Sequence, residues 1–359
     1  MKSSDLPARL APFAAAVRRN CHIADARYAR EMTMCTYLLE MREFYRWERG
    51  LPYGASPPQA EVGAWLAERE ALWEGLQGEG FAPLPLDGVE HDPYAVDAIN
   101  EVLAPQELFY GAGIGRFGKP HFFIARLYRR AARNGARIFV CDDEYVRDMT
   151  TVPAASQGDA VIVRREALRR WLWEQAEAWD AKRSRGALQL AFDAYSAEAD
   201  LAQGIERMVA AETDTLILHE LGEHAAGRAL GPGWEAMLVA CRSRRAEVLV
   251  RAVRDNLADC ASTLPALLDA RMRGSLHFWF ANFKGMRLAL FPTLHAAYVR
   301  WREHGDDERL RRLVDAGRDH WLQVAKRLLD DFARRGPEFE AELERLSHEP
   351  GELSPAAPG

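Results

Sequence analysis

Apolar and polar residues alternate along most of this chain with the period of an α-helix, about 3.6 residues. The first long periodic stretch, residues 22–49, ends at Gly50, a residue type that commonly terminates helices. A second helix is predicted over residues 59–76, and from residue 164 the helical pattern continues to about residue 346. The periodicity therefore predicts a mainly α-helical protein.

The middle of the chain is dense in glycine and proline and carries the convincing β signals. Residues 78–120 are predicted to form loops with one short helix over residues 95–103. Helical periodicity returns over residues 121–134. Two runs rich in β-branched and apolar residues, 136–141 and 159–163, then predict a small element of two or three strands.

These elements predict a multi-helical, bundle-like domain with a small β-hairpin-like insertion. We expect an N-terminal helical segment, residues 1–76, that packs on the core, and a region of Gly/Pro-rich loops with the small β element, residues 77–164. A helical core over residues 165–346 would carry the candidate metal site, and residues 347–359 are predicted to be a disordered tail.

One glycine-rich segment, residues 110–120 (YGAGIGRFGKP), invites comparison with phosphate-binding loops. In a P-loop the lysine is followed by Ser or Thr and then by a helix, whereas Lys119 is followed by Pro120. No clear strand leads into the glycines, as a dinucleotide site would require. We therefore expect a flexible lid or a turn-rich connection at residues 111–118.

Composition and charge narrow the function classes. The chain has 359 residues, 48% of them hydrophobic, a formal net charge of −6 and an isoelectric point near 6.0, which gives no electrostatic footprint for nucleic acid. Five scattered cysteines without a CxxC pair suggest a reducing compartment. No segment approaches the roughly 20 apolar residues that span a bilayer. We expect a cytoplasmic protein that acts on a small-molecule substrate and has neither nucleic acid nor a membrane as partner. The sequence is compatible with a homo-oligomer.

The segment His219-Glu220-Leu221-Gly222-Glu223-His224 places four ionisable side chains within a strongly apolar helix. On a helix, His219 and Glu223 project about 40° apart, as do Glu220 and His224, so all four lie within an arc of about 140°. Buried carboxylates shift their pKa or find a partner, and a bound cation is one such partner. The alternative is a buried hydrogen-bond network that serves structure only.

Carboxylates elsewhere could complete a metal site. Glu212 lies two turns earlier on nearly the same line of the helix, and Glu40 lies on an aromatic face of the first helix. Glu247 and Asp255 share one face of the helix that follows, although this i, i+4 spacing also suits an ordinary ion-pair ladder. The predicted metal ligands are His219, Glu223, His224, Glu212, Glu40, Glu247 and Asp255, with Glu220 as the catalytic residue.

The segment LILHELGEHAAG resembles the HExxH helix of the zincin metallopeptidases with one residue inserted. The insertion places His219 and His224 about 140° apart, whereas a zincin zinc pair is about 40° apart. His219 and Glu223 keep the required spacing, and Glu220 matches the position of the zincin general base. The resemblance implies zinc and a hydrolase.

A second resemblance, in composition and architecture, is to the helical di-metal proteins of the ferritin-like class. Carboxylates outnumber histidines in the candidate set, which favours non-haem iron or manganese. Three interpretations follow: an iron or manganese oxidoreductase acting on a small molecule, a zincin-like zinc hydrolase with Glu220 as general base, and a non-catalytic helical protein with a structural His/Glu network.

Overall fold

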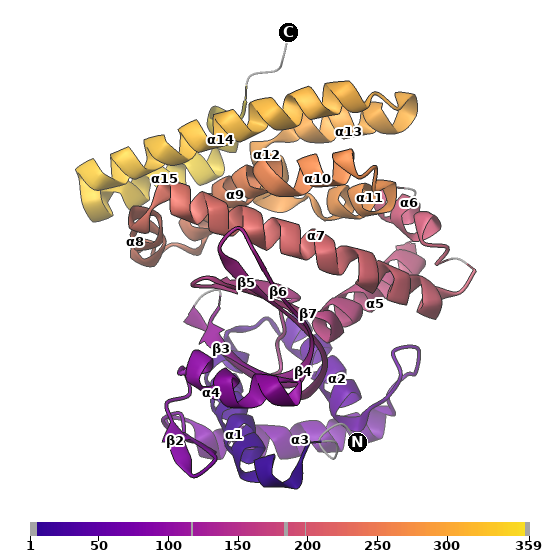
Figure 1. The fold of residues 1–359 in the computed structure, drawn as a ribbon, viewed down its shortest axis with the longest axis vertical. Coiled ribbons are helices and arrows are strands. Elements are labelled where there is room, and N and C mark those ends of the chain that lie inside the picture. Colours follow the sequence, from indigo (N-terminus) through magenta and orange to yellow (C-terminus); the bar gives the residue numbers. More distant parts are fainter. Residues whose placement is uncertain (1–5, 116–117, 183–185, 198, 356–359) are drawn as a thin grey trace. The chain divides into compact units, whose positions relative to one another are not determined.

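The computed structural model describes residues 6–115, 118–182, 186–197 and 199–355 (Figure 1). The chain forms two compact units, and each is built from more than one segment. The first unit comprises Met1–Ala131, Ile138–Pro153 and Ile162–Trp173. The second comprises Ala132–Arg137, Ala154–Val161 and Glu174–Gly359.

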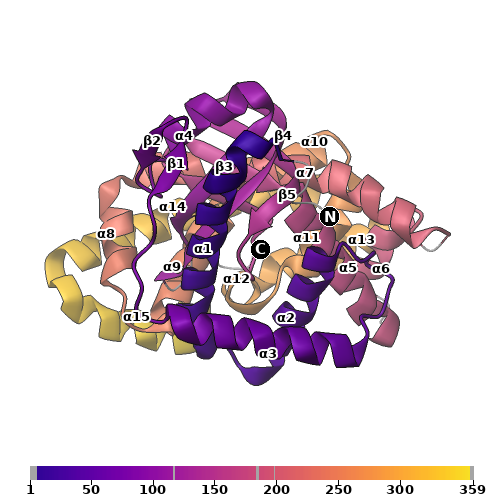
Figure 2. The ribbon, with the colours of Figure 1, turned by 90° about the horizontal axis from the view of Figure 1, so that it is seen from below.

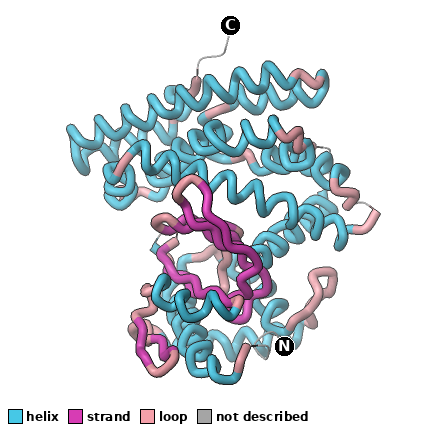
Figure 3. Tube along the Cα trace, in the orientation of Figure 1, coloured by secondary structure: helices cyan, strands magenta, loops and turns pink. Residues whose placement is uncertain are grey.

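Helices make up most of the described chain, coloured cyan in Figure 3. The α-helices are α1 (Ala11–Tyr28), α2 (Met34–Arg49), α3 (Gln59–Leu76), α4 (Val96–Leu103), α5 (Arg165–Lys182), α6 (Ala187–Ala194), α7 (Leu201–Leu230), α8 (Pro232–Ala240), α9 (Arg244–Ala258), α10 (Leu264–Asp269), α11 (Arg273–Asn282), α12 (Gly285–Leu290), α13 (Pro292–His304), α14 (Asp307–Arg335) and α15 (Phe339–His348). Short 3-10 helices are η2 (Ala8–Leu10), η3 (Ala29–Glu31), η4 (Ala104–Gln106), η7 (Gly336–Glu338) and η8 (Pro350–Leu353), and η6 (Asp259–Thr263) is a π-helical turn.

Two sheets make up the β structure of the described chain. The strands are β1 (Leu84–Leu86), β2 (Val89–His91), β3 (Leu108–Ile114), β4 (Pro120–Arg133), β5 (Ala136–Arg147), β6 (Ala154–Gln157) and β7 (Ala160–Arg164). Strands β1 and β2 pair with each other, and the other five form a curled sheet in the order β3-β4-β5-β7-β6. The structure is 68% helical, which confirms the mainly α prediction, but the β content is larger than the predicted small hairpin.

The prediction of a helix over residues 121–134 is wrong, because this segment is strand β4. Strands β4 and β5 are joined at Asn134 and Gly135, whose φ angles are +54° and +82°. This left-handed pair is the two-residue connection that suits the twist of a β-hairpin, and Asn-Gly is its preferred sequence. The Asn-Gly pair is therefore the sequence signal for a hairpin that the prediction of a helix over residues 121–134 did not take into account.

The glycine-rich segment is also a strand in part, since residues 108–114 form β3. Gly111 pairs with Phe123 on β4, and a Cβ added at Gly111 would lie 2.0 Å from the Phe123 ring. The glycine is thus required so that the aromatic ring can pack over the neighbouring strand. Residues 111–114 thus belong to a strand and not to the expected lid or turn-rich connection, and residues 116–117 of this segment lie outside the described part.

The predicted helix over residues 22–49 is interrupted. Helix α1 ends at Tyr28 and α2 begins at Met34, after Thr33. The Thr33 hydroxyl accepts a hydrogen bond from the Thr36 backbone N–H at 3.3 Å, so Thr33 caps the new helix. Figure 2 shows α3 crossing the ends of α1 and α2.

The first unit has an aromatic core between its helices. Phe44 and Tyr45 of α2 pack edge-on against Trp65 of α3, with ring centroids 5.9 and 5.4 Å apart. On the other side of α1, Phe13 packs edge-on against Tyr110 of β3 at 5.7 Å. Helix α1 therefore joins the helical part of this unit to its sheet.

The second unit is a helical assembly around one large apolar cluster. Trp234 of α8 and Trp321 of α14 are fully buried in it, and Phe291 packs edge-on against Trp321 at 5.6 Å. Leu353 of η8 is also buried, so the predicted disordered tail contains an ordered turn before its last four residues, 356–359, which lie outside the described part. Among the described helices, none is both long enough and apolar enough to cross a membrane.

Candidate metal centre

Helix α7 carries His219, Glu220 and Glu223 in its second half. The helix begins after Asp200, whose carboxylate accepts a hydrogen bond from the Gln203 backbone N–H at 3.0 Å. It runs for 30 residues and ends at Gly231, with φ of +74°, immediately before Pro232. Thus α7 is defined by a capping residue at one end and by a glycine and a proline at the other.

Gly222 allows α7 to approach the end of α9 very closely. A Cβ added at Gly222 would lie 2.6 Å from the Ala258 carbonyl oxygen and 3.0 Å from the Ser262 Cβ. The Ser262 hydroxyl also donates a hydrogen bond to the Leu218 carbonyl oxygen at 2.7 Å. The glycine inside the HELGEH segment therefore brings the His219 side of α7 against α9 and η6.

The π-helical turn η6 (Asp259–Thr263) lies at this contact. The Leu264 backbone N–H donates to the Asp259 carbonyl oxygen, a five-residue step. Pro265, which has no backbone N–H, follows within the first turn of α10. Turns of this kind are rare and are often found at functional sites, and this one starts at a carboxylate that contacts His219.

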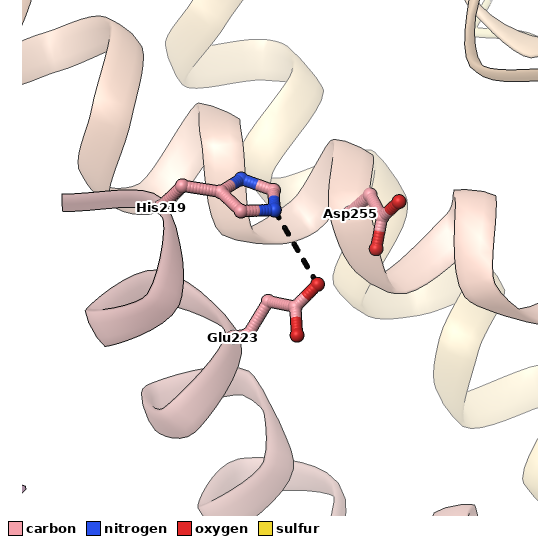
Figure 4. Close-up of side chains that lie close together, drawn as sticks. All are labelled: His219, Glu223 and Asp255. Atoms are coloured by element: carbon pink, nitrogen blue, oxygen red, sulfur yellow. Dashed lines mark ion pairs between the residues drawn. The ribbon is translucent and has the colours of Figure 1, made fainter. Parts of the chain in front are cut away.

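Three of the predicted ligands come together here: His219 and Glu223 from α7 and Asp255 from α9 (Figure 4). One ligand atom of each lies within 4.8 Å of the others. His219 Nε2 is 3.4 Å from Glu223 Oε1. Asp255 is buried, whereas the side chains of His219 and Glu223 are 21% and 14% exposed.

Asp259 fixes the orientation of His219. Its Oδ1 lies 2.8 Å from His219 Nδ1 and accepts a hydrogen bond from Trp279 Nε1 at 3.2 Å, while Arg287 pairs with its other oxygen. A carboxylate on one imidazole nitrogen holds the other nitrogen toward a metal in many metal sites. With Nδ1 held by Asp259, His219 Nε2 is the nitrogen that faces Glu223.

The surroundings shift the protonation of these groups strongly. Burial, and then the charge of Glu223, raise the pKa of Asp255 to about 7. Burial and Glu223 also raise the pKa of Glu220 to about 7. Burial opposes the ionised form of Glu223 as well, but its hydrogen bond with His219 and the charge of Arg254, 2.8 Å away, lower its pKa below the usual range.

His219 and Asp259 stabilise each other's ionised forms. Burial alone would lower the pKa of His219, but the charge and hydrogen bond of Asp259 raise it well above its usual value. Burial likewise opposes ionisation of Asp259, and Arg287 and His219 lower its pKa. In the absence of a bound cation, a charged His219 between two carboxylates is therefore the favoured state.

Acidic side chains outnumber basic side chains around the cluster. Four carboxyl groups meet two guanidinium groups here, the latter on Arg254 and Arg287. With a neutral histidine, full ionisation would leave two negative charges in excess. A divalent cation would balance them, and two bound protons would do the same.

Glu220 lies beside the three-residue cluster. It is 6% exposed, and the Ser156 hydroxyl of β6 donates a hydrogen bond to its Oε2 at 2.6 Å. The charges of Glu223 and His219 both act on it. A carboxyl group whose pKa is raised to about 7 can take up and release a proton near neutral pH.

Four of the predicted ligands are not part of the cluster in the described structure. Glu212 is buried about two turns earlier on α7 and accepts hydrogen bonds from Tyr195 and Ser275, both at 2.9 Å. Glu247 pairs with Arg251 at 2.7 Å, as an ion-pair ladder does, and His224 is half-buried. Glu40 belongs to the first unit, where it pairs with Arg170 at 2.9 Å.

The predicted ligand set does not include the residues that support the cluster. Asp259 follows Asp255 by one helical turn, so the i, i+4 spacing was a usable signal for it. Arg254 is next to Asp255 in sequence, but its pairing with α7 depends on how the two helices pack. Trp279 and Arg287 come from α11 and α12, and no local pattern links them to this site.

Two family models match the chain. The N-terminal domain of the family of unknown function DUF6866 matches residues 12–164, and the C-terminal domain of the same family matches residues 169–350. The second match alone covers more than half of the chain. No curated protein and no solved structure matches the chain.

Proposed function

The chain belongs to the DUF6866 family of unknown function, and we propose from the geometry of the cluster that it is a divalent-metal-dependent enzyme acting on a small molecule. His219, Glu223 and Asp255 would hold one metal ion. The observation that carries the proposal is the convergence of their three ligand atoms within 4.8 Å, with His219 Nδ1 held by Asp259.

The ligand set favours manganese or iron. One imidazole nitrogen and two carboxylate oxygens form a mainly oxygen-bearing set, which suits Mn²⁺ or Fe²⁺ better than a thiolate or all-histidine site would. Neither Glu212 nor Glu247 joins the cluster, so one ion is proposed instead of a bridged pair. We infer an oxidoreductase, in which the bound metal supplies the redox chemistry.

A zinc hydrolase is the second candidate, and the position of Glu220 favours it. In such an enzyme a bound metal lowers the pKa of water, and a nearby carboxylate takes up its proton. Glu220 is buried beside the cluster, and its hydrogen bond from Ser156 fixes the carboxylate. Its role in either reaction would be to carry a proton to or from the bound substrate or water.

The third interpretation is a structural network without metal. Charged His219, held between Asp259 and Glu223, and the pairs of Arg254 and Arg287 would account for most contacts. This interpretation requires that Asp255 remain protonated at neutral pH, since burial and the charge of Glu223 oppose its ionisation. It differs from the metal proposal in one measurable property, the metal content.

Elemental analysis of protein purified without added metal tests the proposal. We expect about one manganese or iron per chain, retained in the control variant Glu247→Gln and lost in His219→Ala and Asp255→Asn. One zinc per chain would select the hydrolase instead. No metal in the purified protein, together with no uptake from added Mn²⁺, Fe²⁺ or Zn²⁺, would leave the structural network.

The role of Glu220 has its own test. If it carries a proton, Glu220→Gln retains the metal and loses turnover, since the amide cannot exchange the proton. Loss of the metal in Glu220→Gln would make it a ligand and refute the proton-carrier role. A cytoplasmic location and a small-molecule substrate remain part of the proposal.

A further inference from the structure

A second site candidate lies in the first unit, where a pocket with a volume of about 90 Å³ is lined by α2 and the loop after it, the end of β5 and the start of α5. Trp47, Leu51 and Ala167 give it apolar walls. Arg147 and Thr151 contribute polar groups. The metal centre belongs to the second unit, so this cavity is a separate feature.

Three polar donors that line the cavity have no hydrogen-bond partner among the described residues: Trp47 Nε1, Arg147 Nε and Thr151 Oγ1. Each of these atoms is shielded from solvent. A buried donor without a partner costs about 1–3 kcal/mol, and native proteins usually avoid this cost. All three groups can donate, so the chemistry that would satisfy them together is a group of oxygen acceptors.

Arg147 is the charged member of this set, and it is poorly paired. It is 3% exposed, and its two hydrogen bonds, to the carbonyl oxygens of Met149 and Glu43, are both 3.4 Å long. The nearest carboxylate oxygen, on Glu144, is 3.9 Å from its Nε. Its guanidinium lies over the Trp47 ring, 4.8 Å from the centroid. Such long contacts leave much of the charge uncompensated.

Three glutamates also line the cavity, and each already has a partner. Glu144 pairs with Arg164 at 2.7 Å, and Glu43 pairs with Arg42 at 2.9 Å. Glu166 accepts a hydrogen bond from the Glu144 backbone N–H at 2.7 Å. Their negative charges would oppose a doubly charged ligand, whereas a singly charged one needs only Arg147.

Two more arginines line the cavity, and both pair with glutamates. Arg170 pairs with Glu40 at 2.9 Å, and Arg46 pairs with Glu43 at 3.6 Å. Both add positive charge near the cavity, and Arg46 compensates part of the charge of Glu43. Among the three arginines that line the cavity, Arg147 is thus the one with the longest polar contacts.

We propose that this cavity binds a small monocarboxylate, whose oxygens accept hydrogen bonds from Arg147, Trp47 and Thr151. The carbon atoms of the acid would lie against Leu51 and Ala167. The cavity is several times the ~10–15 Å³ that one water needs and smaller than the ~150 Å³ cavity that takes up benzene. It therefore suits an acid of the size of acetate or propionate.

Titration calorimetry and thermal unfolding with sodium propionate test the proposal, with sodium chloride and sodium phosphate at equal ionic strength as comparisons. Propionate is expected to bind once per chain and to raise the melting temperature, because a ligand that binds only the folded state stabilises it. Phosphate is expected to do neither. Binding of phosphate in place of propionate would refute the ligand class, and binding of neither would show a cavity filled by water only.

Variants locate the binding site. Arg147→Gln should weaken propionate binding about ten- to hundredfold, the effect of losing a charged hydrogen bond, whereas Arg126→Gln, an exposed arginine outside the cavity, should not change it. Because Arg147→Gln can also disturb folding, Thr151→Val and Ala167→Leu provide independent tests. The first removes one donor and the second fills the cavity. Unchanged binding in both would overturn the site.

Discussion

Substitution of Gly222 by alanine tests whether the close approach of α7 to α9 builds the metal centre. The added Cβ would lie 2.6 Å from the Ala258 carbonyl oxygen, a backbone atom that cannot rotate away. The helices must therefore move apart by several tenths of an ångström. This movement would separate Glu223 on α7 from Asp255 on α9.

The expected free-energy change has two opposing parts. Overpacking of a tight contact costs about 1–3 kcal/mol. Alanine is favoured over glycine within a helix by about 1 kcal/mol. We therefore expect Gly222→Ala to lower the free energy of unfolding by about 0–2 kcal/mol and to weaken metal binding at the same time.

The same helix provides a matched control at Gly227. A Cβ added there meets no atom within 4 Å, so Gly227→Ala changes helix propensity without a clash. It should raise stability by up to about 1 kcal/mol and leave metal affinity unchanged. Urea unfolding followed by circular dichroism, together with calorimetric titration of Mn²⁺, measures both quantities. If both variants behave alike, close packing at Gly222 does not position the site.

Three further predictions follow from other residues. Asp259→Asn should lower metal affinity about 10- to 100-fold, because the outer carboxylate no longer orients the imidazole; calorimetry with Mn²⁺ checks this, and an unchanged affinity would contradict the role. Glu212→Gln should keep the metal content and change the free energy of unfolding by less than about 1 kcal/mol, because the amide oxygen of glutamine can accept the same hydrogen bonds from Tyr195 and Ser275. Loss of metal in this variant would make Glu212 part of the site. Burial and the charge of Arg69 lower the pKa of His22 to about 3. The unfolded chain binds a proton at His22 below about pH 6.5 and the folded chain does not, so stability is lost as the pH falls from about 6.5 toward 3, by about 2–3 kcal/mol at pH 4.5. His22→Gln should remove this part of the pH dependence of the urea midpoint, and parallel curves for the two proteins would refute it.

The helical part of the fold was predictable because helical periodicity is local. Residues 59–76 and the long region after residue 164 follow it. The error at β4 has a local cause as well. Its exposed half, near Arg129 and Arg133, carries a mixture of apolar and basic residues that does not alternate strictly, so the helical period fitted it better than the strand period. The Asn134-Gly135 turn outweighed that pattern.

The candidate site was predictable only along one helix. The spacing of His219 and Glu223 follows from the helical period, and the structure has them as neighbours. Glu212 shares the same line of the helix but is two turns away, and Tyr195 and Ser275 occupy it. Which carboxylates of other helices join the site depends on helix packing, which Gly222 controls and which no periodic pattern encodes.

Calorimetric titration of Mn²⁺ into metal-free protein, with Asp255→Asn measured beside the wild type, tests the metal centre most directly. We expect one ion to bind per wild-type chain, and an affinity at least about tenfold weaker in Asp255→Asn. Binding should also release protons, because the pKa of Asp255 is about 7. The Glu247→Gln control should match the wild type. Equal affinities in wild type and Asp255→Asn, or no binding to the wild type, would contradict the account.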